Sequence, residues 1–165
     1  MALLMHKLFT YFDDTVHANG LFKMDTIGDA YIVAALLSQD QGSKKQCLGM
    51  MAVARAMIEA LGQHHRDTGE QLHCRIGLAV GDVTTGVLGH LQPRFHITGP
   101  GLRAAEALEQ TAPMQDTLHA SDDFLQLVRD RTNATLPDGW HVIDTPAKTA
   151  GVTLALASSP SSTAA

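Results

Sequence analysis

The segment from Phe22 to Val33 constrains the fold most, because two apolar runs there flank the pair Gly28-Asp29. A glycine beside an aspartate between two runs of β-strand character is typical of a tight hairpin turn. Such a turn places Asp29 at the lip of a sheet, where its carboxylate can hold a hard divalent cation such as Mg²⁺. The alternative is that Asp29 only shapes the turn, since aspartate is common in turns.

Length and charge narrow the classes of function. The 165 residues are enough for one domain with a hydrophobic core, and too few for two of ordinary size. The formal net charge of −5 gives no basis for nonspecific nucleic-acid binding, so we expect no nucleic-acid partner. Cys47 and Cys74 follow no metal-binding spacing, which indicates buried thiols in a reducing compartment.

The sequence also bears on the membrane. No apolar run approaches the length of a membrane span, and the first residues lack the basic and apolar regions of a secretory signal. We therefore expect no direct membrane insertion by this chain. The expected location is the cytoplasm. The chain could be there as the cytosolic domain of a membrane or multidomain parent protein.

Hydrophobic periodicity predicts helices separated by strands. Helices are expected over residues 3–16, 44–67, 102–110 and 124–129, the last one capped by Ser121. Besides the first hairpin, over 21–37, strands are expected over 72–80, 83–88, 93–98, 117–120, 140–143 and 152–157. Gly81-Asp82 is interpreted as the turn of a second hairpin, and the last two strands as a third.

This order indicates one α+β domain over residues 1–157, followed by a disordered tail over 158–165 composed of Ser, Pro, Thr and Ala. With a strand placed before the first helix, the order would be βαββαβ. That is a ferredoxin-like core with a mostly antiparallel sheet and helices on one face. In this sequence the first strand is missing, and a small αβ extension follows the core.

Three motifs, in order, resemble the catalytic domain of class III nucleotidyl cyclases. Residues 22–31 resemble the metal-bearing hairpin of that family. The second motif, which follows the family pattern without a gap, is Arg75-Ile76-Gly77, Gly81, Val83, Gly86-Val87 and Gly89. The third, Pro93-Arg94-Phe95 followed by Gly99, resembles the Pro-Arg-Tyr strand of the family and the glycine after it. The resemblance covers residues 3–121, and more weakly the rest.

The resemblance implies a domain that joins the 3′ hydroxyl of a nucleoside triphosphate to its own α-phosphate and releases pyrophosphate. Two divalent cations, Mg²⁺ or Mn²⁺, are expected at the site, held by two aspartates. By resemblance Asp29 is the second of these. The first lies on the strand before the first helix, which this sequence does not contain. We therefore expect this polypeptide alone to bind the ions weakly and to have little or no activity.

Asp25 occupies the position that separates ATP-using members, which carry lysine there, from GTP-using members, which carry glutamate. A carboxylate accepts the N–H donors of guanine and repels the ring nitrogen of adenine, so GTP is expected over ATP. His96 takes the second base-reading position, and because it can donate or accept, it does not decide the base. The alternative for Asp25 is a plain charge at a strand edge.

Two positions depart from the family. Counting from Gly99, Arg103 stands where the family has the asparagine that orients the ribose, and Ala107 where it has the arginine that neutralises phosphate charge. Arg103 could reach a phosphate, or it is a solvated surface arginine. Lys148 is the nearest candidate for the lysine that contacts the triphosphate, with a solvated loop lysine as the alternative.

Two hypotheses for function follow. The first is a cyclase domain that acts as a homo- or heterodimer with the active site at the interface. In the family, one subunit supplies the metal carboxylates and the other supplies the ribose and phosphate contacts. Because this chain keeps one metal carboxylate but departs from the family at the ribose and phosphate positions, it suits a complementary subunit better than a second copy of itself. The alternative is a catalytically silent cyclase-like module that dimerises and regulates. A third reading, an unrelated ferredoxin-like domain, leaves the ordered glycine matches unexplained.

Overall fold

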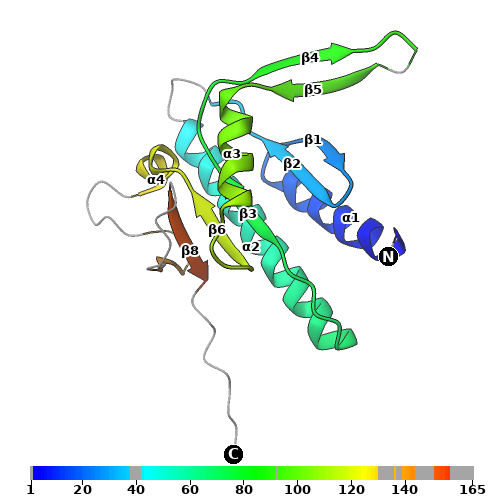
Figure 1. Ribbon diagram of the computed structural model, residues 1–165, viewed down its shortest axis with the longest axis vertical. Coiled ribbons are helices and arrows are strands. Elements are labelled where there is room, and N and C mark those ends of the chain that lie inside the picture. The colour runs from blue at the N-terminus through cyan, green and yellow to red at the C-terminus, as the bar shows by residue number, and fades with distance from the viewer. Residues whose placement is uncertain are drawn as a thin grey trace, which may run out of the picture.

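The structure, a computed structural model, describes residues 2–37, 42–91, 93–129, 136, 139–143 and 151–156. The helices there are α1 (Ala2–Ala18), α2 (Gly42–Thr68), α3 (Pro100–Gln110) and α4 (Asp122–Val128). The strands are β1 (Phe22–Ile27), β2 (Ala30–Ala34), β3 (Arg75–Leu78), β4 (Thr84–Leu88), β5 (Arg94–Thr98), β6 (Thr117–Ala120), β7 (Trp140–Val142) and β8 (Val152–Leu156). Figure 1 shows their arrangement. Lys148 and the predicted tail lie outside the described residues.

Helix α1 ends in a Schellman motif. Gly20 has a positive φ of 65° and donates its N–H to the carbonyl of His17 at 3.0 Å. Leu21 donates to the carbonyl of Val16 at 3.1 Å, and both side chains are buried in one cluster with Val53. This glycine-centred stop turns the chain directly into β1, and the predicted first helix and the hairpin after it are both confirmed.

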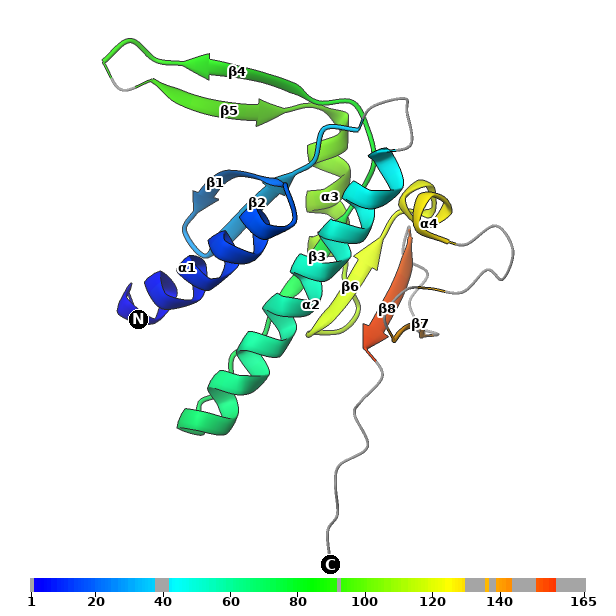
Figure 2. The same cartoon turned by 180° about the vertical axis from the view of Figure 1, so that it is seen from behind.

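Helix α2 is shared by two hydrophobic clusters. Cys47 and Met51 pack with Leu118 and Leu154 of the β6–β8 region, whereas Val53 packs with α1 and the hairpin. Figure 2 shows α2 running between these two parts of the molecule. The helix therefore fixes where the β1–β2 hairpin sits relative to the larger sheet. None of the helices in the described part of the chain is both long and apolar enough to cross a membrane.

The described strands form three sheets rather than the single sheet expected. These are β1–β2, β4–β5 and a four-stranded sheet in the order β3-β6-β8-β7. All pairs are antiparallel except β3–β6, so the mostly antiparallel α+β class is confirmed. The β7–β8 hairpin is confirmed as well. So is the cap of α4, where the Ser121 hydroxyl accepts the Phe124 N–H at 3.3 Å.

The predicted hairpin between 72–80 and 83–88 is wrong, because β3 pairs in parallel with β6 and β4 pairs with β5. Gly81 passes under the start of α3, where an added Cβ would lie 2.8 Å from the Cα of Gly101. Gly101 in turn donates its N–H to the carbonyl of Asp82 at 2.9 Å. Gly81-Asp82 is thus a close crossing with α3 and not a strand-reversing turn.

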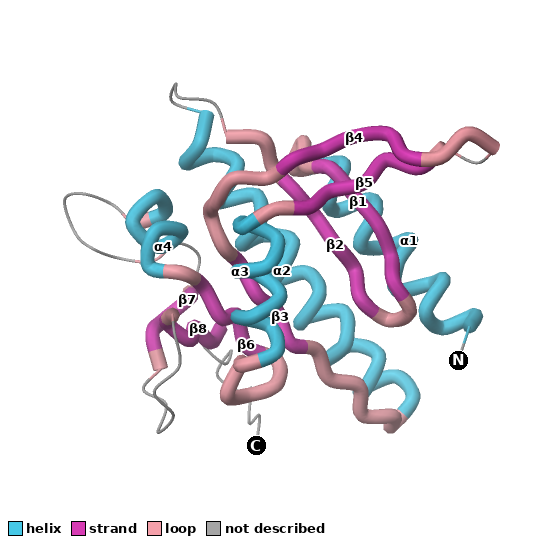
Figure 3. Tube along the Cα trace, turned by 45° about the horizontal axis from the view of Figure 1, so that its top comes forward, coloured by secondary structure: helices cyan, strands magenta, loops and turns pink. Residues whose placement is uncertain are grey.

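Strands β4 and β5 form a two-stranded ribbon that leaves the body near the start of α3. Its far end extends away from the other elements, as Figures 1 and 3 show. Four large apolar side chains on it are strongly exposed: Val87 at 64%, Leu88 at 62%, Leu91 at 92% and Phe95 at 50%. We call this ribbon, residues 84–91 and 93–98, the arm.

Candidate functional site

Asp29 lies at the tip of the β1–β2 hairpin, as predicted. The last pair of the ladder joins Ile27 to Ala30, which leaves Gly28 and Asp29 as a two-residue turn. Gly28 takes the positive φ of 64° that such a turn requires. Asp29 is exposed, and among the described residues no hydrogen bond or ion pair engages its carboxylate. The carboxylate is therefore available to a cation.

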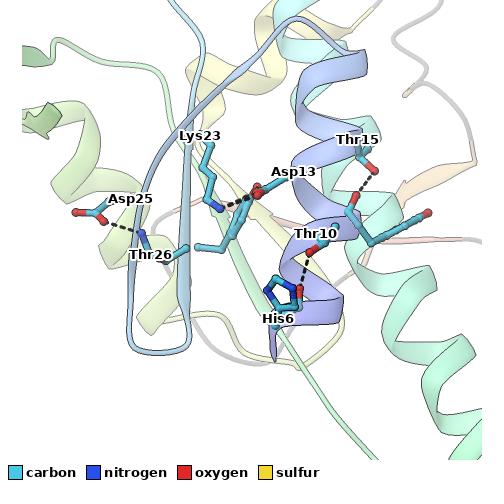
Figure 4. A network of polar contacts seen from close by, with 9 residues as sticks. His6, Thr10, Asp13, Thr15, Lys23, Asp25 and Thr26 are labelled. Carbon is cyan, nitrogen blue, oxygen red and sulfur yellow. Dashed lines mark hydrogen bonds and ion pairs between the residues drawn. The ribbon is translucent and has the colours of Figure 1, made fainter. Parts of the chain in front are cut away.

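A bulge in β1 decides which way Asp25 faces. The ladder pairs Lys23 with Val33 and Asp25 with Ile32, so Met24 is the extra residue. Residues two apart in a regular strand share a face, whereas here Lys23 and Asp25 face opposite sides. The carboxylate of Asp25 is half-buried and accepts the N–H of Thr26 at 2.8 Å. Figure 4 shows Asp25 on the side of the hairpin away from α1.

His96 lies in the middle of β5, paired with Gly86 across the arm, and it is half-buried. Strand β5 contacts β1, so the two positions predicted to read the base are on neighbouring strands. No hydrogen bond or ion pair within the described ranges joins Asp25, Asp29, His96 and Arg103 to one another. The structure thus brings the predicted base-reading strands together without joining their side chains.

Arg103 is exposed on α3. The helix packs chiefly on β3, where Gly77 admits its backbone: an added Cβ would lie 2.1 Å from the carbonyl oxygen of Ala105. Arg103 and Ala107 are four residues apart and both exposed, so they share the outward face of α3. That face offers one guanidinium, and at Ala107 it has no polar group.

The donor set fits one cation better than two. Mg²⁺ bound with a nucleotide commonly uses one or two protein carboxylates, with phosphate and water oxygens as its other ligands. Asp29 supplies one such carboxylate. In the described ranges no three His, Cys, Asp or Glu side chains lie together as a ready-made metal site. The described residues by themselves therefore do not fit a two-ion site.

Sequence reasoning missed the polar contacts that hold the hairpin on α1. Asp13 of α1 accepts hydrogen bonds from Lys23 and Tyr31, which lie on β1 and β2. No local pattern indicates such a contact, because Asp13 and Tyr31 are 18 residues apart. The spacing of aspartate, lysine and tyrosine becomes meaningful only when the Schellman turn folds β1 back along α1.

Neither cysteine is placed for nucleophilic chemistry. Burial raises the pKa of Cys47 to about 11 and, together with the nearby charge of Asp116, that of Cys74 to about 12. Both are free thiols, as expected, but only Cys47 is buried, whereas Cys74 is half-buried. A small cavity of about 180 Å³ lies at the end of α2, lined by His65, His73 and Asp116 among others. It includes none of the predicted site residues.

Known proteins resemble this chain in sequence. Retinal guanylyl cyclase 2 of Rattus norvegicus is 29% identical over 141 residues, which are 84% of this chain and 12% of that protein. The head-specific guanylate cyclase of Drosophila melanogaster is 34% identical over 106 residues, 64% of this chain and 15% of that protein. The chain thus spans only a small part of these relatives.

Solved structures match as well. The guanylate cyclase domain of RhGC from Catenaria anguillulae, in complex with GTP, superposes with a TM-score of 0.68 and 27% identity over 90% of this chain and 78% of that one. The adenylyl cyclase CyaB from P. aeruginosa has the same fold, with a TM-score of 0.67 and 21% identity over 93% of this chain and 79% of that one.

The family model described as the adenylate and guanylate cyclase catalytic domain matches residues 1–140. That match includes the hairpin with Asp25 and Asp29, the arm, and α3. The chain belongs to the adenylate and guanylate cyclase catalytic domain family.

Proposed function

We propose that this chain forms the metal- and base-binding half of a cyclase site that converts GTP to its 3′,5′-cyclic nucleotide and pyrophosphate. The observation that carries the proposal is the free carboxylate of Asp29 at the hairpin tip, with Asp25 on the same two-stranded sheet. Membership of the cyclase family supplies the reaction class. The proposal concerns this domain alone, because the matched relatives are much longer than this chain.

Each residue has a distinct task. Asp29 binds a divalent cation together with the triphosphate, and Asp25 accepts hydrogen bonds from the guanine edge. When bound, the cation, Mg²⁺ or Mn²⁺, neutralises phosphate charge and favours the ionised 3′ hydroxyl. Arg103, the cation on the outward face of α3, is the candidate for phosphate contact. His96 lines the base from β5.

GTP is the proposed substrate because of charge at Asp25. A carboxylate pairs with the N–H donors of guanine, and a site with such a group loses affinity for a base that leaves it unpaired. The relatives reported above are guanylyl cyclases by name, which supports the same choice. Replacing Asp25 by Lys should shift nucleotide preference toward ATP, measured as the ratio of Kd values with Mn²⁺. An unchanged ratio would refute base reading by Asp25.

The proposal includes a dimer, because one chain offers a single carboxylate for the cation, Asp29, and a single arginine for the phosphates, Arg103. The arm is the proposed contact, since its apolar side chains are strongly exposed and a two-stranded ribbon is marginal without a covering surface. Arg103 and Ala107 stand where the family has an asparagine that orients the ribose and an arginine that contacts the phosphates. A partner that carries this asparagine and arginine would complete the site. We therefore propose a heterodimer as the productive form.

The deciding experiment measures cyclic nucleotide formed from GTP or ATP with Mn²⁺. The chain is assayed alone and mixed with a cyclase domain that carries the family's asparagine and arginine on the corresponding helix. We expect cyclic GMP chiefly from the mixture, and its loss when Asp29 is replaced by Ala but not when the exposed Asp14 is replaced by Asn.

The second candidate function is a silent dimerisation module. It is favoured by Ala107, because an alanine stands where the family carries the arginine that neutralises phosphate charge. It predicts that the mixture forms a complex and yields no cyclic nucleotide. It also predicts that replacing Asp29 by Ala leaves that complex unchanged.

A further inference from the structure

Three polar side chains join the hairpin to α1. Lys23 donates to the carboxylate of Asp13, with its Nζ 2.8 Å from both Oδ1 and Oδ2. The hydroxyl of Tyr31 donates to Oδ1 of the same carboxylate. Lys23 also lies over the Tyr31 ring, 5.2 Å from its centroid. Figure 4 shows Lys23 reaching Asp13. We call Asp13, Lys23 and Tyr31 the anchor.

Aromatic packing fixes the third member of the anchor. The Tyr31 ring lies 5.3 Å from the ring of Phe9 and 5.6 Å from that of Phe12, centroid to centroid. Both phenylalanines belong to α1. The ring therefore has few alternative positions, and its hydroxyl is held toward Asp13.

The pKa shifts of Asp13 and Tyr31 keep the anchor intact at neutral pH. Partial burial raises the pKa of Asp13, but hydrogen bonds from Lys23 and Tyr31 and the charge of Lys23 outweigh it and lower the pKa overall. Burial, the hydrogen bond to Asp13 and the charge of Asp13 raise the pKa of Tyr31 above its usual value. A carboxylate that accepts from a neutral hydroxyl and a cation is the stable state.

The anchor connects to the site through the β-ladder. Tyr31 pairs with Thr26, whose N–H binds the carboxylate of Asp25, and Tyr31 follows Asp29 by two residues. The bulge at Met24 turns Lys23 toward α1 while Asp25 faces the other side. One strand thus carries an attachment on one face and a site residue on the other.

The hairpin needs such an attachment because it pairs with no other strand among the described residues. A two-stranded ribbon is marginally stable by itself, so its position depends on the surface beneath it. Apolar packing against Val16 and Val53 holds the base of the hairpin near α2. Among the described residues, the anchor supplies the side-chain hydrogen bonds and the ion pair that join α1 to the hairpin that carries Asp25 and Asp29.

We propose that Asp13, Lys23 and Tyr31 are positioning residues that hold Asp25 and Asp29 in their binding orientation. This rests on the proposed nucleotide function. The three residues touch neither base nor phosphate; they act through the β-ladder. Partly exposed ion pairs add little to global stability, so the expected consequence of losing the anchor is local.

The test compares Asp13→Asn, Lys23→Met and Tyr31→Phe with two controls. Asp14→Asn removes the same charge from the neighbouring exposed position of α1, and Lys23→Arg keeps the cation. The first readout is amide hydrogen exchange of residues 26–31 in the protein without nucleotide. The second is the ratio of Kd values for GTP and ATP with Mn²⁺, which a purely stabilising contact would not change.

We expect exchange of the hairpin amides to be about tenfold faster in the three anchor variants, because local opening sets that rate. We expect the preference for GTP to fall by about tenfold, because displacing a site residue by about 1 Å removes much of its effect. Both controls should stay within about twofold of the wild-type protein on both readouts.

Each contrary result has one meaning. Unchanged exchange in the anchor variants would overturn the anchor itself. Faster exchange with an unchanged GTP-to-ATP ratio would make the anchor a structural contact and overturn its positioning role. A wild-type protein that binds neither nucleotide would refute the proposed function and the positioning role that rests on it, and the exchange data would still decide whether the anchor holds the hairpin.

Discussion

The β1–β2 hairpin and the β4–β5 arm differ in how they are supported. The β1–β2 hairpin lies on α1, with Tyr31 held between aromatic rings and bonded to Asp13. The β4–β5 arm leaves the body and exposes Val87, Leu91 and Phe95. Similar local pairing thus serves two purposes. One hairpin presents charged residues on a fixed base, and the other presents an apolar surface that no described part of the chain covers.

The largest expected effect is a loss of stability at the β1–β2 hairpin, the better supported of the two. Phe12 is 7% exposed and packs on Tyr31, so Phe12→Ala leaves a cavity beneath the hairpin. It should lower the free energy of unfolding by about 3–5 kcal/mol, measured by urea denaturation. The matched change in the arm, Phe95→Ala, should cost less than about 0.5 kcal/mol because Phe95 is half exposed. Equal losses would mean that the arm is packed as firmly as the hairpin.

A second, smaller effect concerns association through the arm. Val87 is 64% exposed, so replacing it by Asp should leave the unfolding free energy nearly unchanged. The same change should weaken dimer formation by about tenfold, roughly 1.4 kcal/mol, because it places a charge in an apolar contact. Sedimentation equilibrium measures the dimer constant. Dimers of unaltered strength would place the interface elsewhere.

The smallest effect is the pH dependence of the anchor. Since the folded state lowers the pKa of Asp13, the stabilisation is present above the unfolded value of 3.8 and is lost as pH falls through the folded value. Since the folded state raises the pKa of Tyr31, its part is present below 10.0 and is lost as pH rises through the folded value.

The measurement is the difference in unfolding free energy between wild-type protein and Asp13→Asn. It should be constant from about pH 5 to 9 and stay below about 1 kcal/mol, because Asp13 and Lys23 are partly exposed. A difference that changes steeply near pH 7 would assign the effect to a histidine instead.

Short-range patterns in the sequence predicted much of the fold. The turn at Gly28-Asp29, the cap at Ser121 and the strand from Thr117 to Ala120 depend on neighbouring residues, and all were found as expected. The pairing of β3 was predicted wrongly because Gly81 meets Gly101, twenty residues later, where no local signal could report it. For the same reason Asp13 was not recognised as a partner of Tyr31.

The roles of Asp25, Asp29, His96 and Arg103 came from comparison with a family pattern, and they stay predictions until the nucleotide experiments are made. The structure adds where their side chains start: two on the hairpin, one on the arm and one on the outward face of α3. It also shows that the described chain offers only one free carboxylate at the hairpin tip.

The sequence by itself determined where the chain turns and which residues stand at the turns, because backbone preferences and hydrophobic periodicity act over a few residues. Only the tertiary structure decided the partner of β3, the face of Asp25 and the attachment of the hairpin to Asp13. Those features depend on which apolar faces can be buried together and on polar groups that meet across distant segments, and neither is encoded in any short stretch of the chain.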